Sequence, residues 1–352
     1  MKTAIVYSQK YLEHKTGSDH PERPQRLIAV MNGIRKSGLM ECKEISLIEP
    51  NPASLEDLQL VHTQPYINKV RLICEGGGGL INEETLVSKE SFEVAKLAAG
   101  GAIKAAQEVI SGKFDNAFAL VRPPGHHAGI SYSLGFCIFN NVALVAKHLI
   151  ANQGVNRILI LDIDAHHGNG TQEIFYNTNS VLYVSIHEDP TEFPRTGFAR
   201  EVGVNEGKGY TVNIPLPYGS GDPAYWKAFK KIVLPIAEQY HPQIILVSAG
   251  FDGYYRDMIS DLSLSAYIYP KIFQTILDLA RKLCDGKMVA VLEGGYNLWF
   301  LKRVVATCIA KMAGTASKKV RDRRPPINPE IEKEANKVID VVRRIQSRYW
   351  SL

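Results

Sequence analysis

The amino-acid sequence predicts an α/β fold in which helices cover both faces of a single, mostly parallel sheet of eight strands. Strand-like runs alternate with amphipathic helical patterns along the chain, as they do in such folds. Several of the strand-like runs are continuously apolar, which is typical of parallel strands that are buried on both faces. No linker-like segment divides the 352 residues, so we expect a single domain over residues 1–352.

Eight segments have the composition of strands. Six of them are strong, at residues 4–7, 117–121, 158–163, 181–186, 244–248 and 288–292. Two are weaker, at residues 44–48 and 210–214. Between the strands, apolar side chains recur at helical spacing in residues 91–110, 141–150, 223–240, 265–283 and 298–312.

The remaining segments are irregular or lie at the C-terminus. Residues 8–24 and 186–209 are long loops, and loops of that length in a compact domain usually build sites. The four glycines at 76–79 lack the Gly-Lys-Ser/Thr ending of a phosphate-binding loop, so we predict a flexible surface turn. A last helical pattern at 330–344 predicts a helical tail, at about 328–352, packed on the domain.

The amino-acid composition limits the classes of protein to which the chain can belong. The chain is 45% hydrophobic and 22% charged, as soluble globular enzymes are. A net charge of +5 is too weak to predict a nucleic-acid partner, and the basic segment at 318–324 is interpreted as a solvated loop. The five cysteines are scattered, which argues against a disulfide framework and favours the cytoplasm. No segment predicts a signal peptide or a membrane span.

Four polar motifs each follow a predicted strand. They are Arg-Pro-Pro-Gly-His-His at 122–127, Asp-Ile-Asp-Ala-His-His-Gly-Asn-Gly at 162–170, Gly-Phe-Asp at 250–252 and Glu-Gly-Gly-Tyr at 293–296. Open α/β sheets place their sites at the carboxyl ends of strands. We therefore expect the four motifs to form one site.

The residue types in these motifs suit a metal site with an acid–base pair. Asp164 and His166 point the same way if the strand end is extended, and Asp252 can add a third ligand. Three oxygen and nitrogen ligands leave one position open, as catalytic zinc sites do. Adjacent His126 and His127 suit general acid–base work, since histidine titrates near neutral pH. A structural role for a single aspartate or histidine is the alternative, but it explains the whole set poorly.

On these motifs the chain resembles the zinc-dependent histone deacetylase family, which includes bacterial and archaeal deacetylase-like amidohydrolases and acetylpolyamine amidohydrolases. The resemblance is collinear from Tyr7 to about Met312. It includes His-Pro-Glu-Arg-Pro-Gln-Arg-Leu at 20–27 and Gly-Phe-Cys-Ile-Phe-Asn-Asn at 135–141. It implies the arginase/deacetylase fold and hydrolysis of acetyl or other short acyl groups from lysine side chains or similar primary amines.

The resemblance also implies catalytic roles. His127 would be the general base and then the general acid for the leaving amine. His126 would assist electrostatically, with Asp162 beside it. Asn169 would be the partner of His127, where many members of the family carry aspartate. Tyr296 would polarise the acyl carbonyl and stabilise the oxyanion.

The implied binding residues form three further groups. One zinc ion would be held by Asp164, His166 and Asp252. A narrow substrate tunnel would be formed by Gly135, Phe136, Phe193, Ile259, Gly294 and Gly295, with Gly135 accepting the substrate amide hydrogen. Structural K⁺ or Na⁺ ions would lie at an inner site of Asp162, Asp164, His166, Ser185 and Ile186, and at an outer site of Phe175, Thr178, Val181 and Tyr210.

Two other functions are weaker alternatives. A two-manganese ureohydrolase would need further carboxylates, but His167-Gly168 and Gly253-Tyr254 stand at the relevant places. A catalytically silent acyl-lysine binding protein would need a broken site, and every expected residue is intact. The sequence does not separate acetylated protein lysine from acetylated polyamines, although Ile259 stands where one polyamine-selective branch carries glutamate. It also leaves the formation of a homo-oligomer open.

Overall fold

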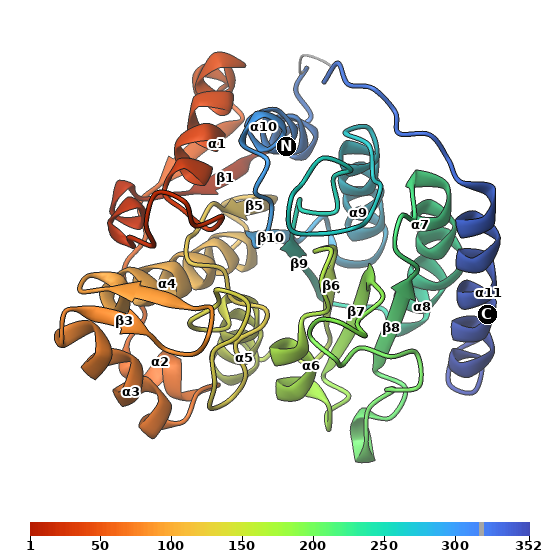
Figure 1. The fold of residues 1–352 in the computed structure, drawn as a ribbon, viewed down its shortest axis with the longest axis horizontal. Helices are drawn as coiled ribbons and strands as arrows, with labels where there is room; N and C mark the ends of the chain where they lie inside the picture. The colour runs from red at the N-terminus through yellow and green to blue at the C-terminus, as the bar shows by residue number, and fades with distance from the viewer. Residues whose placement is uncertain (317–319) are drawn as a thin grey trace.

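The computed structural model describes residues 1–316 and 320–352, which surround an eight-stranded parallel sheet (Figure 1). Across the sheet the order is β2 (Ile45–Ile48), β1 (Thr3–Val6), β5 (Asn116–Ala119), β10 (Met288–Leu292), β9 (Ile244–Ala249), β6 (Ile158–Asp162), β7 (Val181–Glu188) and β8 (Thr211–Leu216). Every pairing in this sheet is parallel. The predicted α/β class and the sheet of eight strands are confirmed.

The central strands are buried on both faces, which explains why their sequences do not alternate between apolar and polar residues. Every residue of β1, β5, β6, β7, β9 and β10 is buried. Covering both faces of a parallel sheet requires two layers of helices. The hydrophobic core is therefore the sheet together with the inner faces of these helices.

Two groups of helices flank the sheet. In the first, α4 (Ser91–Ile110) packs on α5 (Asn141–Gln153), and three short helices pack beside them: α2 (Leu55–Gln59), α3 (Gln64–Glu75) and α6 (Asn169–Phe175). In the second, neighbouring helices contact one another in the order α1 (Gln25–Lys36), α10 (Leu298–Ala313), α9 (Ile268–Cys284) and α8 (Leu234–Tyr240), and α7 (Asp222–Ala228) precedes α8 in the chain. One π-helical turn, Phe229–Val233, joins α7 to α8.

The helices α1, α2, α3 and α6 are absent from the sequence-based prediction. For α1 the signal was present, because Leu27, Val30, Met31 and Ile34 follow helical spacing and all four are buried. The helix lies inside a basic, polar stretch, which obscured that spacing. The loops at 8–24 and 186–209 also contain short 3₁₀ helices, Gln9–Glu13 and Asn205–Gly207.

The predicted surface turn at 76–79 covers only Gly76 and Gly77, which form an exposed turn, and the prediction was wrong for Gly78 and Gly79. Gly78 and Gly79 begin strand β3 (Gly78–Leu80), which pairs antiparallel with β4 (Leu86–Ser88) in a separate two-stranded sheet. Gly78 has φ +101°, and a Cβ there would lie 2.4 Å from the Val87 carbonyl oxygen. Glycine is therefore needed for close strand approach rather than for a turn.

The C-terminal helix α11 (Pro329–Gln346) packs against β8 and α7, at the right-hand side of Figure 1. Its buried residues Ala335, Ile339 and Val342 follow the predicted apolar spacing. The extent of one domain over all of residues 1–352 stays a prediction. Lys318 and Lys319 of the basic segment lie outside the described residues, whereas Arg321, Arg323 and Arg324 are exposed. Each helix in the described ranges is too short or too polar to cross a bilayer.

Candidate active site

The four polar motifs meet at one edge of the sheet because the strands that precede them are neighbours. Strands β5, β10, β9 and β6 stand side by side in that order. Their carboxyl ends carry the motifs at 122–127, 293–296, 250–252 and 162–170, respectively. Residues as far apart in the sequence as His127 and Tyr296 are thereby brought to one pocket of about 320 Å³. This is the position at which parallel sheets present their sites.

Three side chains from two strand ends form a compact cluster of oxygen and nitrogen atoms. His166 Nδ1 lies 3.3 Å from Asp164 Oδ1 and 3.3 Å from Asp252 Oδ2. One ligand atom from each of the three residues lies within 4.8 Å of the others, and all three residues are buried. Such a set of donors matches the ligands that zinc takes in catalytic sites.

The hydrogen bonds around the cluster leave lone pairs on its inward-facing atoms for a cation, and of these atoms Asp164 Oδ1 also accepts the His166 backbone amide at 3.0 Å. His166 Nε2 lies 3.2 Å from the Ile259 carbonyl oxygen, to which it can donate only when protonated, so Nδ1 is left with a lone pair. The outer oxygen of each carboxylate accepts a backbone amide. Asp164 Oδ2 accepts the Gly294 amide at 2.8 Å, and Asp252 Oδ1 accepts the Ala165 amide at 2.9 Å. Asp252 Oδ2 is buried without a hydrogen-bond partner. The cluster therefore fits a zinc ion.

The electrostatics of the pair of carboxylates support the same fit. Burial and, after it, the Asp164 carboxylate beside it together raise the pKa of Asp252 to about 7. Two buried carboxylates without a cation are costly, because each charge is removed from water and repels the other. A divalent cation would remove that cost.

Two glycines lie directly against the carboxylates and leave room for them. A Cβ on Gly250 would lie 2.2 Å from Asp164 Oδ2, and one on Gly294 would lie 2.2 Å from Asp252 Oδ2. Neither glycine has a positive φ. These two positions therefore require glycine because of space rather than backbone conformation.

The two histidines of the 122–127 motif lie side by side, and their environments drive them to opposite protonation states. Their ring centroids are 4.0 Å apart. Burial opposes a charge on His126, but the carboxylates of Asp162 and Asp164 outweigh it and raise the pKa of His126 to about 10. Burial lowers the pKa of His127 well below its ordinary value, and a charged His126 lowers it further. One imidazole is therefore cationic and the other neutral.

Each histidine is oriented by a different partner. His126 Nδ1 lies 3.1 Å from Asp162 Oδ2, and that oxygen also accepts the Tyr183 hydroxyl at 3.0 Å. His127 Nδ1 lies 2.8 Å from Asn169 Oδ1. The Asn169 amide donates to the Tyr132 hydroxyl at 3.0 Å, which fixes its oxygen toward the imidazole. His127 therefore donates from Nδ1 and has its lone pair at Nε2.

Tyr296 lines the pocket and is held from two sides. Asp257 Oδ2 accepts the backbone amides of Tyr296 and Asn297 at 2.7 and 2.8 Å. The Arg26 guanidinium lies 4.8 Å from the centre of the Tyr296 ring and donates to the carbonyl oxygens of Gly295 and Glu293. Burial raises the pKa of Tyr296 well above its ordinary value, so its hydroxyl remains a hydrogen-bond donor.

Arg26 belongs to a buried ionic network that sequence reasoning missed. Glu22 accepts Arg122 Nε at 2.7 Å and Arg26 Nη1 at 3.1 Å. All three side chains are buried. Glu22 and Arg26 both lie in the 20–27 motif. That motif contributes to the family resemblance, but its sequence did not indicate that these two side chains form a buried ion pair. The network ties the start of α1 to the loops that follow β5 and β10.

Only part of the predicted tunnel lines the pocket. Gly135, Phe136, Phe193 and Ile259 line it together with His127, His166 and Tyr296. Phe193 packs edge-on against His127 with ring centroids 5.0 Å apart. Gly294 and Gly295 do not line it, because Gly294 packs behind the carboxylates and the Gly295 carbonyl faces Arg26. The consecutive positive φ angles of Gly135 and Phe136, +54° and +65°, direct the Phe136 ring to the wall.

Four carboxylates also line this pocket, and no motif in the sequence indicated them. They are Glu84, Glu188, Glu192 and Asp261, from three segments of the chain. Glu84 accepts the Gly135 amide at 2.6 Å, and Glu188 accepts the Asp261 amide at 2.8 Å. Glu192 and Asp261 are exposed. The pocket is therefore acidic, although Ile259 stands where one branch of the family carries glutamate.

A second group of candidate ligands, His126, Cys137 and Glu293, lies close by. Its atoms have other tasks. Glu293 Oε2 accepts the backbone amides of Gly125 and His126 at 2.7 and 3.2 Å. Burial raises the pKa of Cys137 well above its ordinary value, so the thiol is protonated and a poor ligand. All five cysteines lie in the described residues, and none forms a disulfide there.

The residues implied in monovalent cation sites lie at the two ends of β7. At its carboxyl end, Ser185 is in register with Asp162 of β6, and Ile186 follows it. At its amino end, Val181 lies near Thr178, whose amide donates to the Phe175 carbonyl at 3.3 Å. Tyr210 is adjacent, because its carbonyl accepts the Tyr183 amide at 2.9 Å. Both sets are thus brought together, and their use as cation sites stays a prediction.

Comparison with known proteins places this geometry in a family. A model of the histone deacetylase domain matches residues 20–312. A probable deacetylase of Archaeoglobus fulgidus is 43% identical over 99% of both chains. A histone deacetylase-like amidohydrolase of Pseudomonas aeruginosa is 35% identical over 89% of this chain and 81% of its own. The crystal structure of the HDA15 HD domain superposes with a TM-score of 0.89 at 35% identity, covering 99% of this chain and 95% of that one. The chain therefore belongs to the histone deacetylase family.

Proposed function

We propose that this protein is a zinc-dependent amidohydrolase that removes acetyl or other short acyl groups from lysine side chains or similar primary amines. Family membership supports deacetylase activity. The observation that carries the finer proposal is the buried cluster of Asp164, His166 and Asp252, beside one neutral and one cationic histidine. A buried acid–base pair next to such a cluster suits hydrolysis of an unactivated amide.

Zinc is the proposed ion because the cluster offers one imidazole and two carboxylates and no thiolate. When bound, zinc would act as a Lewis acid, lowering the pKa of water and polarising the acyl carbonyl. K⁺ or Na⁺ at the two ends of β7 is a further proposal, which rests on the resemblance of those residues. These ions would support the loop that carries the zinc ligands.

His127 is proposed as the general base and, afterwards, as the general acid. Its Nε2 lone pair is available because Nδ1 faces Asn169 Oδ1. It would accept the proton of the attacking water and pass it to the leaving amine. His126, cationic beside Asp162, would remain charged and stabilise negative charge that develops on the acyl group.

Tyr296 is proposed to donate a hydrogen bond to the acyl oxygen as it gains negative charge. A phenol whose pKa is raised by burial keeps its proton through the cycle. Asp257 and Arg26 fix the backbone on either side of it, so little reorganisation is needed. Phe136 and Phe193 would sandwich a thin acyl-lysine or acyl-amine chain, and the Gly135 carbonyl would accept its amide hydrogen.

A second candidate substrate class, acetylated polyamines, is favoured by a specific observation. Glu84, Glu188, Glu192 and Asp261 line the pocket, and no lysine or arginine lines it within the described residues. A substrate with a further ammonium group near the acyl amide would gain from these charges, through Coulomb attraction and faster encounter. A basic peptide around the acylated lysine would gain in the same way.

A kinetic panel tests both levels of the proposal. Acetyl-lysine peptides with basic or acidic neighbours should be compared with acetylated putrescine, cadaverine and spermidine, each with and without chelator. Turnover that is lost with chelator and restored by zinc is the expected result. Binding of an acetyl-lysine peptide without turnover would instead indicate the silent binding protein, and release of urea from arginine would indicate the ureohydrolase.

Cytoplasmic location and the absence of specific nucleic-acid partners stay predictions from composition. The oligomeric state, including a homo-oligomer, also stays open. Size-exclusion chromatography with light scattering would settle the latter directly.

A further inference from the structure

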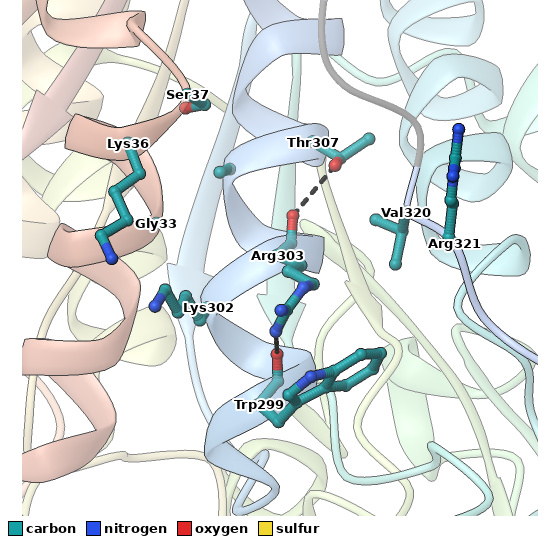
Figure 2. Close-up of a pocket in the computed structure, with 10 residues that line it drawn as sticks. Gly33, Lys36, Ser37, Trp299, Lys302, Arg303, Thr307, Val320 and Arg321 are labelled. Atoms are coloured by element: carbon teal, nitrogen blue, oxygen red, sulfur yellow. Dashed lines mark hydrogen bonds between the residues drawn. The ribbon is translucent and has the colours of Figure 1, made fainter.

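A second groove, separate from the active site, lies on the outer face of α10. It is a groove of about 870 Å³ between α1 on one side and the extended segment at 320–321 on the other (Figure 2). Trp299, which is 46% exposed, gives it apolar surface, whereas Ala306 and Val320 beneath are buried. The Arg303 guanidinium lies 4.1 Å from the centre of the Trp299 ring, so it covers part of that ring. At Gly33, α1 comes so close that a Cβ would lie 1.7 Å from the Lys302 carbonyl oxygen.

Four cationic side chains from three segments line this groove. Lys36 comes from α1, Lys302 and Arg303 from α10, and Arg321 from the segment after it. In Figure 2 the side chains of Lys36 and Lys302 extend into the space between the two helices. No carboxylate lines the groove in the described part of the chain, and none of the four cations takes part in an ion pair there. The groove therefore carries uncompensated positive charge.

The surroundings of these cations favour an extended ligand over a compact phosphate group. From Lys302 to Thr307 the floor of the groove is the middle of α10, where the backbone amides already donate to carbonyl oxygens of the same helix. The hydroxyls of Ser37 and Thr307 donate to the carbonyls of Ile34 and Arg303. Phosphate sites are normally built from free backbone amides. Here only long side chains spread along an apolar floor are available.

We propose that this groove docks an acidic polypeptide segment of a partner protein, with one apolar side chain against Trp299 and carboxylates paired with the cations on either side. Charge complementarity identifies the partner, because the groove offers four positive charges and no negative one. The exposed aromatic ring offers the kind of anchor around which peptide interfaces are organised. This docking site is independent of the proposed hydrolysis.

The test is fluorescence anisotropy with a fluorescein-labelled peptide of glutamate, aspartate and leucine residues that has one central phenylalanine. The groove variant carries Lys302→Glu and Arg321→Glu. The matched control carries Lys89→Glu and Lys231→Glu, which are exposed, lie outside the groove and change the charge equally. The groove variant should bind about tenfold more weakly or worse, while the control binds like the unmodified protein.

Two further measurements make the outcome decisive. Trp299→Ala should also weaken binding, and a glutamine/asparagine version of the peptide should bind about tenfold more weakly than the acidic one. Unchanged turnover of a small acetyl-lysine substrate shows that the variants are folded. Equal binding by the groove and control variants, or equal binding of the neutral peptide, would overturn the proposal. Tighter binding of inorganic tripolyphosphate than of the peptide, at equal ionic strength, would also overturn it.

Discussion

Replacing Gly294 with alanine should weaken zinc binding strongly, because the added methyl group would meet two of the proposed ligands. The added Cβ would lie 2.2 Å from Asp252 Oδ2 and 2.5 Å from Asp164 Oδ2. Real Cβ atoms essentially never come within 3.0 Å of such atoms, so the nearer contact is short by about 0.8 Å. Backbone strain does not contribute, because Gly294 has no positive φ.

The size of that displacement determines how much zinc affinity we expect the variant to lose. Metal–ligand distances in proteins stay within about 0.2 Å of their usual values. If the loop that carries Gly294 moves away and the carboxylates stay in place, the Gly294 amide loses its hydrogen bond of 2.8 Å to Asp164 Oδ2. Disturbing one group that orients a ligand typically costs about 10- to 100-fold in metal affinity. Since two ligands are disturbed together, we expect zinc affinity to fall about 100-fold, with turnover falling in parallel.

The measurement is zinc content by mass spectrometry after dialysis against buffers of fixed free zinc. Gly221→Ala is the matched control, because its Cβ would meet nothing closer than 3.4 Å and its φ is −105°. That variant should bind zinc like the unmodified protein. Circular dichroism of the metal-free proteins checks that both are folded. A folded Gly294→Ala protein with undiminished zinc affinity would refute the assignment of the two carboxylates as ligands.

Three further predictions concern catalysis and stability. Tyr296→Phe should keep its zinc and lose about a hundred- to thousandfold in kcat on an acetyl-lysine peptide; near-normal kcat would remove the oxyanion role. His127→Ala should lose about 10²- to 10⁴-fold in turnover, and more than His126→Ala at equal zinc content, as steady-state kinetics would show; the reverse order would exchange their roles. Although burial opposes it, the charges of Arg122 and its neighbours lower the pKa of Glu22 to about 2. Stability from ionised Glu22 is therefore present above about pH 4.5 and lost as the pH falls toward 2. Denaturant unfolding should find Glu22→Gln about 3–5 kcal/mol less stable at pH 7, with the difference shrinking below pH 4.5; a pH-independent difference would contradict this.

Much of the site could be anticipated because strand ends and motifs coincide in the sequence. Asp164, His166 and Asp252 follow strong apolar runs, and a parallel sheet brings such ends to one edge. The sequence did not indicate that β5 and β10 would be neighbours, since strand order depends on long-range packing. The roles assigned to the individual site residues stay predictions.

Other features could not be anticipated, because they depend on which way loop side chains face. Glu84, Glu188 and Asp261 come from separate segments, and only the folded chain brings them to one pocket. Arg321 was interpreted as part of a solvated basic loop, yet it lines a groove with Lys36, which is far away in the sequence. Periodicity detects the buried face of an element, and it carries no information about convergence of exposed charges.

The C-terminal helix has a consequence for how the molecule behaves at high concentration. Strand β8 ends the sheet and pairs only with β7, so its outer edge could recruit a strand of another molecule. Gln346 donates to the Thr211 carbonyl at 3.1 Å, and the Trp350 indole donates to the Gly209 carbonyl at 2.9 Å. These bonds occupy acceptors that an incoming strand would use. A chain ended at residue 316 would lose this cover, and we expect it to aggregate where the longer chain stays dispersed.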